Sequence, residues 1–238
     1  MKNSQKSLFL VFPAYVIGVV IGLYLIVIAG WADMESAFYG FSHAADVGLQ
    51  GFSCPILMTS TETGTISLKV TNPTDNLLRP SVKVDISTPS LAEESLKNME
   101  LAPGESKLLT WPVGPKNIDL GNFIFAKAMV YSIYPLPSQE VTCGIFIVNL
   151  PGSGRVILSL LVAVGLLGMG WGLYGMRKVS DGWVGKYFRA LVFLAGIIVL
   201  GVIVSFEIGW IFSVIGLAIA VLMIFTLLGT FFLSGRKK

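Results

Sequence analysis

The chain has 238 residues, of which 54% are hydrophobic and 13% are charged. Soluble globular domains carry about 25% charged residues, so this composition argues against a wholly soluble protein. This hydrophobic composition, which includes 26 glycines and 15 phenylalanines, also excludes a disordered chain, a coiled coil and a collagen-like chain. The net charge of +3 gives no argument for nucleic-acid binding.

Most of the hydrophobic residues gather in four runs that contain no Asp, Glu, Lys, Arg or His. The runs cover residues 8–30, 156–176, 190–206 and 208–233. An α-helix needs roughly 20 residues to cross the hydrocarbon core of a bilayer, so each run predicts a spanning helix. Tyr187 and Phe188 extend the shortest run into the membrane interface. We therefore expect four transmembrane helices.

The first run has two interpretations. Lys2 and Lys6 precede it, as basic residues precede a signal peptide. However, the run exceeds the roughly 7–15 apolar residues of a signal-peptide core, and Gly30-Trp31-Ala32 is a poor cleavage site. We favour an uncleaved anchor.

The charges sort by segment, and this sorting predicts the topology. The two terminal tails and the loop 177–189 together hold nine basic residues and one acidic residue. Segment 31–155 instead holds eight basic and twelve acidic residues. Short loops rich in Lys and Arg remain on the cytoplasmic side. We expect both termini and loop 177–189 in the cytoplasm, and segment 31–155 outside.

The basic clusters also point to the lipid bilayer as a partner. Contact with lipid headgroups explains them, and we expect no nucleic-acid partner. Four aromatic residues lie at the predicted helix ends, as residues of an aromatic belt do. These are Trp31, Trp183, Tyr187 and Trp210.

Segment 31–155 differs in character from the apolar runs, since it holds ten of the eleven prolines and both cysteines. Alternation of apolar and polar residues predicts strands. On this ground strands are expected within 66–70 and 82–86; a further strand within 108–111 follows the turn at 102–105, and two more are expected in the β-rich runs 122–134 and 141–150. Residues 91–99 favour a helical turn, and 32–53 fit either an interfacial helix or the lead-in to a strand. Short strands separated by turns indicate an antiparallel β-sandwich. The expected fold is thus an α+β membrane protein, with the sandwich (31–155) inserted between the first helix (1–30) and the other three (156–238).

Part of this segment resembles a known family. Residues 65–75, Leu101-Ala102-Pro103-Gly104-Glu105-Ser106 and Leu109-Thr110-Trp111-Pro112-Val113 are similar to bacterial Ig-like and CARDB-type adhesion modules. In those modules a strand ending in an xVxN turn precedes an LxPGE hairpin. The resemblance covers roughly residues 60–150. It implies an Ig-like sandwich of about seven strands, with a binding or spacing role and no catalytic residues.

The two cysteines, Cys54 and Cys143, fall outside the cytoplasm in this topology, where disulfides persist. We predict a disulfide between them; two separately buried thiols are the alternative. We expect no metal site, because His43 is the only histidine and no Cys-x-x-Cys occurs. No cofactor is expected either.

Small residues recur in two of the predicted helices. Gly18 and Gly22 form one Gly-x-x-x-Gly pattern, and Gly168 and Gly172 form another. Such faces let two helix backbones approach closely. The partner is either another helix of the same chain or a second subunit, and both remain open. The absence of ionisable residues from the runs argues against transport or a proton relay.

The leading functional hypothesis is a non-enzymatic integral membrane protein. It presents an Ig-like domain for protein–protein interaction, or for assembly of a membrane complex with other membrane or envelope proteins. The second hypothesis is a receptor or adhesin that binds an envelope glycan or another ligand. An exposed cluster of Trp111, Tyr131 and Tyr134 would favour it.

The third hypothesis is a membrane-surface enzyme or transporter component. Its site would use Asp33, Arg155 or Glu207 at the outer boundary. Glu207 and Trp210 also form a candidate interface in the short last loop. There is no Asn-x-Ser/Thr acceptor, because Asn72 precedes a proline, and no lipidation signal is evident. We therefore expect a prokaryotic plasma membrane.

Overall fold

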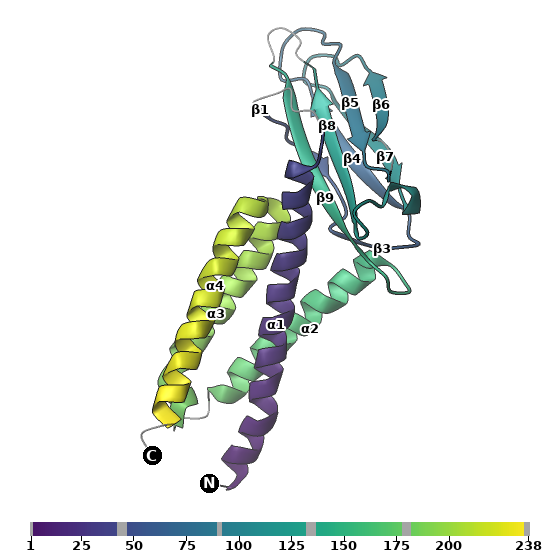
Figure 1. Cartoon of the computed structure of the whole chain (residues 1–238). Helices are drawn as coiled ribbons and strands as arrows, with labels where there is room; N and C mark the ends of the chain where they lie inside the picture. The colour runs from purple at the N-terminus through teal and green to yellow at the C-terminus, as the bar shows by residue number, and fades with distance from the viewer. Residues whose placement is uncertain (1, 42–46, 90–91, 132–136, 178–181, 236–238) are drawn as a thin grey trace. The chain divides into compact units, whose positions relative to one another are not determined.

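The structure is a computed structural model that describes residues 2–41, 47–89, 92–131, 137–177 and 182–235. The chain divides into two compact units (Figure 1). The helical unit comprises Met1–Gly30 and Ile157–Lys238, and the β unit comprises Trp31–Val156. The fold is therefore α+β, and each unit is described by itself.

Four long helices occupy the expected places. They are α1 (Lys2–Phe38), α2 (Gly154–Met176), α3 (Gly182–Glu207) and α4 (Trp210–Gly235). Within the part of the chain that the structure describes, these four are long and apolar enough to cross a membrane. α3 and α4 are joined by Ile208 and Gly209, and the φ of Gly209 is +121°. Glycine tolerates that angle where other residues are strained, so it permits this tight turn.

The helical unit has its own core. Its buried side chains come from all four helices and include Ile26, Met169, Ile198 and Leu227. The Tyr15 hydroxyl donates a hydrogen bond of 2.7 Å to the Leu191 carbonyl oxygen, which links α1 to α3. α2 and α4 leave many large apolar side chains exposed, including Trp171 at 73%. Such a surface suits a lipid environment better than water.

The glycine faces lie between helices of this chain. A Cβ atom at Gly18 would lie 2.5 Å from the Met169 nitrogen and 2.7 Å from the Gly165 oxygen. A Cβ atom at Gly168 would lie 2.7 Å from the Ala14 oxygen, and a Cβ atom at Gly172 would clash in the same way with the backbone of Tyr15. Since the obstacles are backbone atoms, no rotamer change relieves them. α1 and α2 therefore pack through glycines within one chain. Gly22 instead faces the Ile198 side chain of α3.

Replacing Gly168 with isoleucine is expected to separate α1 from α2 and destabilise the helical unit by about 2 kcal/mol, the scale of overpacking. Gly170→Ile is the matched control, because a Cβ atom there has no neighbour within 4 Å. The midpoint of heat-induced aggregation in detergent measures both variants. Equal midpoints for the two variants would contradict packing of α1 on α2.

The β unit contains two sheets. The strands are β1 (Val47–Gly48), β2 (Phe52–Ser53), β3 (Leu57–Thr59), β4 (Gly64–Thr71), β5 (Ser81–Ile86), β6 (Glu93–Asn98), β7 (Ser106–Val113), β8 (Phe123–Val130) and β9 (Gln139–Val148). The six-stranded sheet has the order β1-β9-β8-β5-β6, with β3 also paired to β9, and the three-stranded sheet has the order β2-β4-β7. A strand is present in each of the five expected ranges.

The helical turn predicted for residues 91–99 is wrong. Residues 93–98 form the edge strand β6, which pairs antiparallel with β5 from Glu93↔Ile86 to Asn98↔Ser81. The prediction placed Glu93, Glu94 and Lys97 on the solvent side of a helical turn. Backbone pairing with β5 overrides that local preference.

Apolar residues from both sheets form one core. β4 contributes Ile66 and Leu68, β5 contributes Val82 and Val84, and all four are fully buried. Cys54 and Cys143 are joined in a disulfide, as predicted, and both pack against this core. The bond closes a loop of 89 positions, so it spans most of the β unit.

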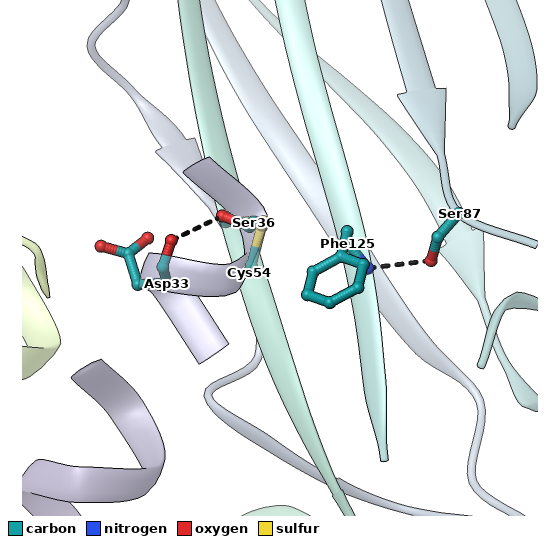
Figure 2. The surroundings of a disulfide bond; sticks show 6 residues. Asp33, Ser36, Cys54, Ser87 and Phe125 are labelled. Carbon is teal, nitrogen blue, oxygen red and sulfur yellow. Dashed lines mark hydrogen bonds between the residues drawn. A yellow bond between two sulfur atoms is a disulfide. The ribbon is translucent and has the colours of Figure 1, made fainter. Parts of the chain in front are cut away.

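The last turns of α1 belong to the β unit and cover the outer face of the larger sheet. Ala32 and Ser36 have no exposed surface, and the backbone of Ala32 occupies the place that a Cβ atom of Gly144 would need. Figure 2 shows this end of α1 beside the strands, near the disulfide. Farther along, the Tyr39 ring packs 4.5 Å from that of Phe125, which is fully buried. Residues 32–38 are therefore helical, and the strand lead-in follows them.

A buried ion pair lies on the same face. Lys127 on β8 is 2% exposed, and its Nζ lies 2.8 Å from the Glu140 Oε2 on β9. Asp85 on β5 is opposite Lys127 in the strand register and is also buried. Charges lose much solvation when buried, so such groups require partners. The outer face of this sheet is thus a second, partly polar interior.

A carboxylate marks the start of α2. The Glu62 Oε2 accepts hydrogen bonds from the Gly154 N–H (2.7 Å) and the Thr59 N–H (3.1 Å), and Oε1 accepts one from the Ser153 hydroxyl (2.8 Å). Partial burial acts to raise the pKa of Glu62, but these hydrogen bonds outweigh it and hold the pKa below its ordinary value. A negative charge at a helix N-terminus is also favourable.

Glu62→Gln is expected to cost about 1 kcal/mol at neutral pH, the scale of a helix-capping interaction. Because the folded-state pKa is lowered, the ionised group stabilises the protein above its ordinary pKa. This contribution is lost as the pH falls through the folded-state pKa, so variant and wild type converge in acid. Urea unfolding at several pH values tests this, with exposed Asp75→Asn as control. A loss that does not depend on pH would contradict it.

Candidate functional site

A pocket of about 560 Å³ opens at the end of the β unit where β9 begins. Its walls come from both sheets: the end of β4 on one side, and the end of β8 with the start of β9 on the other. α2 begins near the opposite end of β9, since Gly154 contacts Leu57 and Met58, which pair with Phe146 and Ile147. β9 has 10 residues. At about 3.3 Å per residue, the pocket and the start of α2 are roughly 30 Å apart.

The floor of the pocket is apolar and its rim is polar. Val70, Leu78 and Leu101 are buried residues that line the floor. Polar residues on the rim are Gln50, Lys69, Thr71, Tyr131 and Gln139. An apolar floor with a few polar groups is typical of ligand pockets, which range over about 300–1,000 Å³.

A buried asparagine organises the loops beneath the pocket. The Asn72 side-chain N–H₂ donates to the carbonyl oxygens of Asn76 (2.7 Å), Leu101 (3.0 Å) and Ala102 (3.1 Å). Its Oδ1 accepts a hydrogen bond from the Thr74 N–H at 2.9 Å. The asparagine therefore ties the turn after β4 to the loop before β7. These are the two motifs on which the family resemblance rests.

A close approach shapes one wall. Gly51 has a φ of +82°, and a Cβ atom there would lie 2.8 Å from the Lys69 oxygen. The Lys69 N–H also donates to the Gly51 carbonyl oxygen at 2.9 Å. Only glycine satisfies both the backbone angle and this distance without strain. The short strand β2 is thereby held against β4.

The lining chemistry suits binding. Lys69 and Tyr131 are the ionisable groups among the described lining residues, and no carboxylate, histidine or thiol joins them. Nucleophilic or general acid–base chemistry requires a base positioned beside a reactive group. Such a pocket offers shape, amide hydrogen bonding and one positive charge.

The aromatic cluster considered for glycan binding is not assembled as expected. Trp111 is 4% exposed and lies in the core, where its Nε1–H donates to the Ser95 Oγ at 3.2 Å. The Lys97 ammonium lies 4.7 Å from the centre of the Trp111 ring. Tyr131 is 40% exposed and lines the pocket. Tyr134 lies outside the described residues.

The residues of the third hypothesis lie in separate elements. Asp33 lies in the part of α1 that belongs to the β unit, and its backbone carbonyl oxygen accepts a hydrogen bond of 3.0 Å from the Ser36 hydroxyl (Figure 2). Arg155 is in the first turn of α2 and is exposed. Glu207 ends α3 and Trp210 begins α4, in the helical unit. His43 lies outside the described residues.

Comparison with solved structures gives distant similarities. The chain resembles the CARDB domain of a Pyrococcus furiosus protein, solved in complex with di-metal ions. The match has 14% identity and a TM-score of 0.34, and covers 45% of this chain and 98% of that domain. A β-glucosidase from Erythrobacter marinus matches with 21% identity and a TM-score of 0.29, over 41% of this chain and 15% of the glucosidase. No family model and no curated protein matches the chain.

Neither the metal ions nor the glucosidase activity transfers to this chain at such similarity. Among the residues that the structure describes, no group of three or more His, Cys, Asp or Glu lies together so that it could hold a metal ion.

Sequence reasoning missed the cover on the larger sheet and the Lys127–Glu140 pair. The signal was present in β8, whose residues Phe-Ile-Phe-Ala-Lys-Ala-Met-Val are apolar at both alternating sets of positions except for Lys127. A strand that is apolar on both faces is buried on both faces. It therefore required a layer outside the sheet, and α1 supplies it.

Proposed function

We propose that this chain is an integral membrane protein that presents an Ig-like sandwich outside the cytoplasm for binding another protein. Four helices without ionisable side chains in their apolar runs support insertion in a bilayer. The basic tails and the loop 177–189 support a cytoplasmic location of both termini. The disulfide supports an oxidising environment for the β unit.

The single observation that carries the binding role is the position of the pocket. It lies at the opposite end of β9 from the start of α2. Its lining residues suit recognition, and the exposed Tyr131 ring is a typical anchor for an interface hot spot. The buried apolar floor and the exposed Tyr131 ring support a protein surface as the ligand, and Lys69 supplies one positive charge at the rim.

A test is affinity purification of the full-length protein in mild detergent. Tyr131→Ala is expected to reduce the recovery of the co-purifying partner about tenfold, as loss of a hot-spot residue does. Leu108→Ala is the matched control, since Leu108 is 67% exposed on β7 and does not line the pocket. A monomer without a stoichiometric partner would contradict the proposal. Tyr131-dependent binding of envelope glycans, without a protein partner, would replace it with the receptor hypothesis.

A further inference from the structure

One loop of the β unit holds an exposed leucine in a strained backbone conformation. Leu120 has a φ of +45°, the one positive φ of a non-glycine residue in the described part of the chain. Its side chain is 62% exposed. Backbone strain of this kind is found mostly at functional positions.

The conformation is imposed by several hydrogen bonds. Asp119 and Phe123 exchange two backbone hydrogen bonds, of 2.7 and 3.1 Å. The Asp119 Oδ1 accepts the Leu120 N–H at 2.7 Å, and the Tyr39 hydroxyl donates to Oδ2 at 2.5 Å. Burial, followed by this bond to Asp119, raises the pKa of Tyr39 to about 12, so the hydroxyl stays a donor at physiological pH. These hydrogen bonds therefore hold the loop in a conformation that leaves the Leu120 side chain exposed.

Two other exposed apolar residues lie at the same end of the β unit. The Asn122 carbonyl oxygen accepts the Ile147 N–H at 2.8 Å, and Leu150, three residues further, is 53% exposed. Trp31 is 50% exposed, and its ring lies 6.5 Å from that of Phe123. Its indole N–H donates to the Glu35 Oε1 at 2.8 Å. We call Leu120, Leu150 and Trp31 the apolar rim, which is distinct from the polar rim of the pocket.

The carboxylates of Asp119 and Glu62 at this end are occupied by hydrogen bonds within the protein. The exposed ionisable residue next to Leu150 along the chain is Arg155, a cation. Exposed leucine and tryptophan with a cation form the composition that binds the interfacial region of a bilayer.

We infer that the apolar rim inserts into the interfacial region of the bilayer, with Leu120 as its anchor. The inference rests on the proposed membrane insertion, because Trp31 and Gly154 are the points at which the β unit continues into apolar helix. The strain at Leu120 is then offset by transfer of its side chain from water to lipid. The rim thereby adds a second attachment to the membrane beside the helices.

The test uses the full-length protein reconstituted in phosphatidylcholine vesicles. Leu120→Cys is labelled with an environment-sensitive fluorophore; both native cysteines are in the disulfide, so the introduced thiol takes the label. Leu77→Cys is the matched control, since Leu77 is 55% exposed at the pocket end, next to Leu78. Leu222→Cys, 67% exposed on α4, reports insertion of the helices.

Interfacial side chains lie about 5–10 Å into the boundary of headgroups and acyl chains, so a quencher near the lipid headgroup is expected to remove roughly half the emission at position 120. Emission at position 77 should be unchanged, and a quencher deep in the acyl chains should act at position 222. If position 222 is quenched but position 120 responds like position 77, the rim inference is overturned and membrane insertion stands. If position 222 is not quenched, both are overturned.

Discussion

Replacing Cys54 and Cys143 together with alanine is expected to lower the free energy of unfolding of the β unit by about 4–5 kcal/mol. The bond closes a loop of 89 positions, so its removal restores much conformational freedom to the unfolded chain. Hydrogen exchange of the β4 and β8 amides in the full-length protein reports opening of the β unit alone. Exchange should accelerate by roughly three powers of ten, since each 1.4 kcal/mol corresponds to a factor of ten.

Reduction of the wild-type protein provides the control for this experiment. Reduced wild type and the double alanine variant should exchange at similar rates, because both lack the cross-link. Unchanged protection in the double variant would show that the core between the sheets holds the β unit without the bond.

Lys127→Met is expected to cost about 3 kcal/mol, because removing one partner of a buried ion pair leaves the other charge without compensation. Here the effect falls on two carboxylates. Glu140 loses an ion pair of 2.8 Å, and Asp85 loses the cation opposite it in the strand register. The same exchange measurement applies, and the β8 and β9 amides should show the largest change.

A second variant separates the charge effect from simple loss of packing. In Lys127→Met with Glu140→Gln, the uncompensated charge at position 140 is removed, so we expect much of the protection to return. If the losses of protection caused by Lys127→Met and by Glu140→Gln simply add in the double variant, the two side chains do not depend on each other, and the prediction is contradicted. Lys83→Met is a useful comparison, since Lys83 bonds Asp85 and Glu94 but is more exposed, at 22% of its side chain.

The sequence predicts those parts of this fold that depend on local pattern. Apolar runs identify the four helices, alternation identifies β4 and β5, and β-rich runs next to turn signals identify β7, β8 and β9. β6 was missed because its residues carry no apolar alternation. β6 contacts the other sheet through individual polar interactions, such as the hydrogen bond from the Trp111 Nε1–H to the Ser95 Oγ. No periodic pattern in the sequence predicts such interactions.

The candidate site depended on tertiary structure for a similar reason. The pocket joins residues from 48–51, 69–80, 101, 130–131 and 137–139, which are distant in sequence. Asn72 stood in a recognisable motif, but its role as the tie between two loops appears only when the three carbonyl oxygens are in place. Trp111 and Tyr131 look alike as exposed aromatic candidates in sequence, yet one is in the core and the other at the pocket.

The continuity of α1 has a practical consequence for anyone who excises the β unit as a soluble fragment. A fragment that began at the first strand, Val47, would lack the layer formed by Ala32, Ser36 and Tyr39. It would expose Phe125, and a flat apolar sheet face in water favours self-association. The useful boundary is therefore inside a helix, near Trp31, where cutting a chain is usually avoided. A fragment that starts there begins within a helix, but it keeps the helical layer that covers the outer face of the larger sheet.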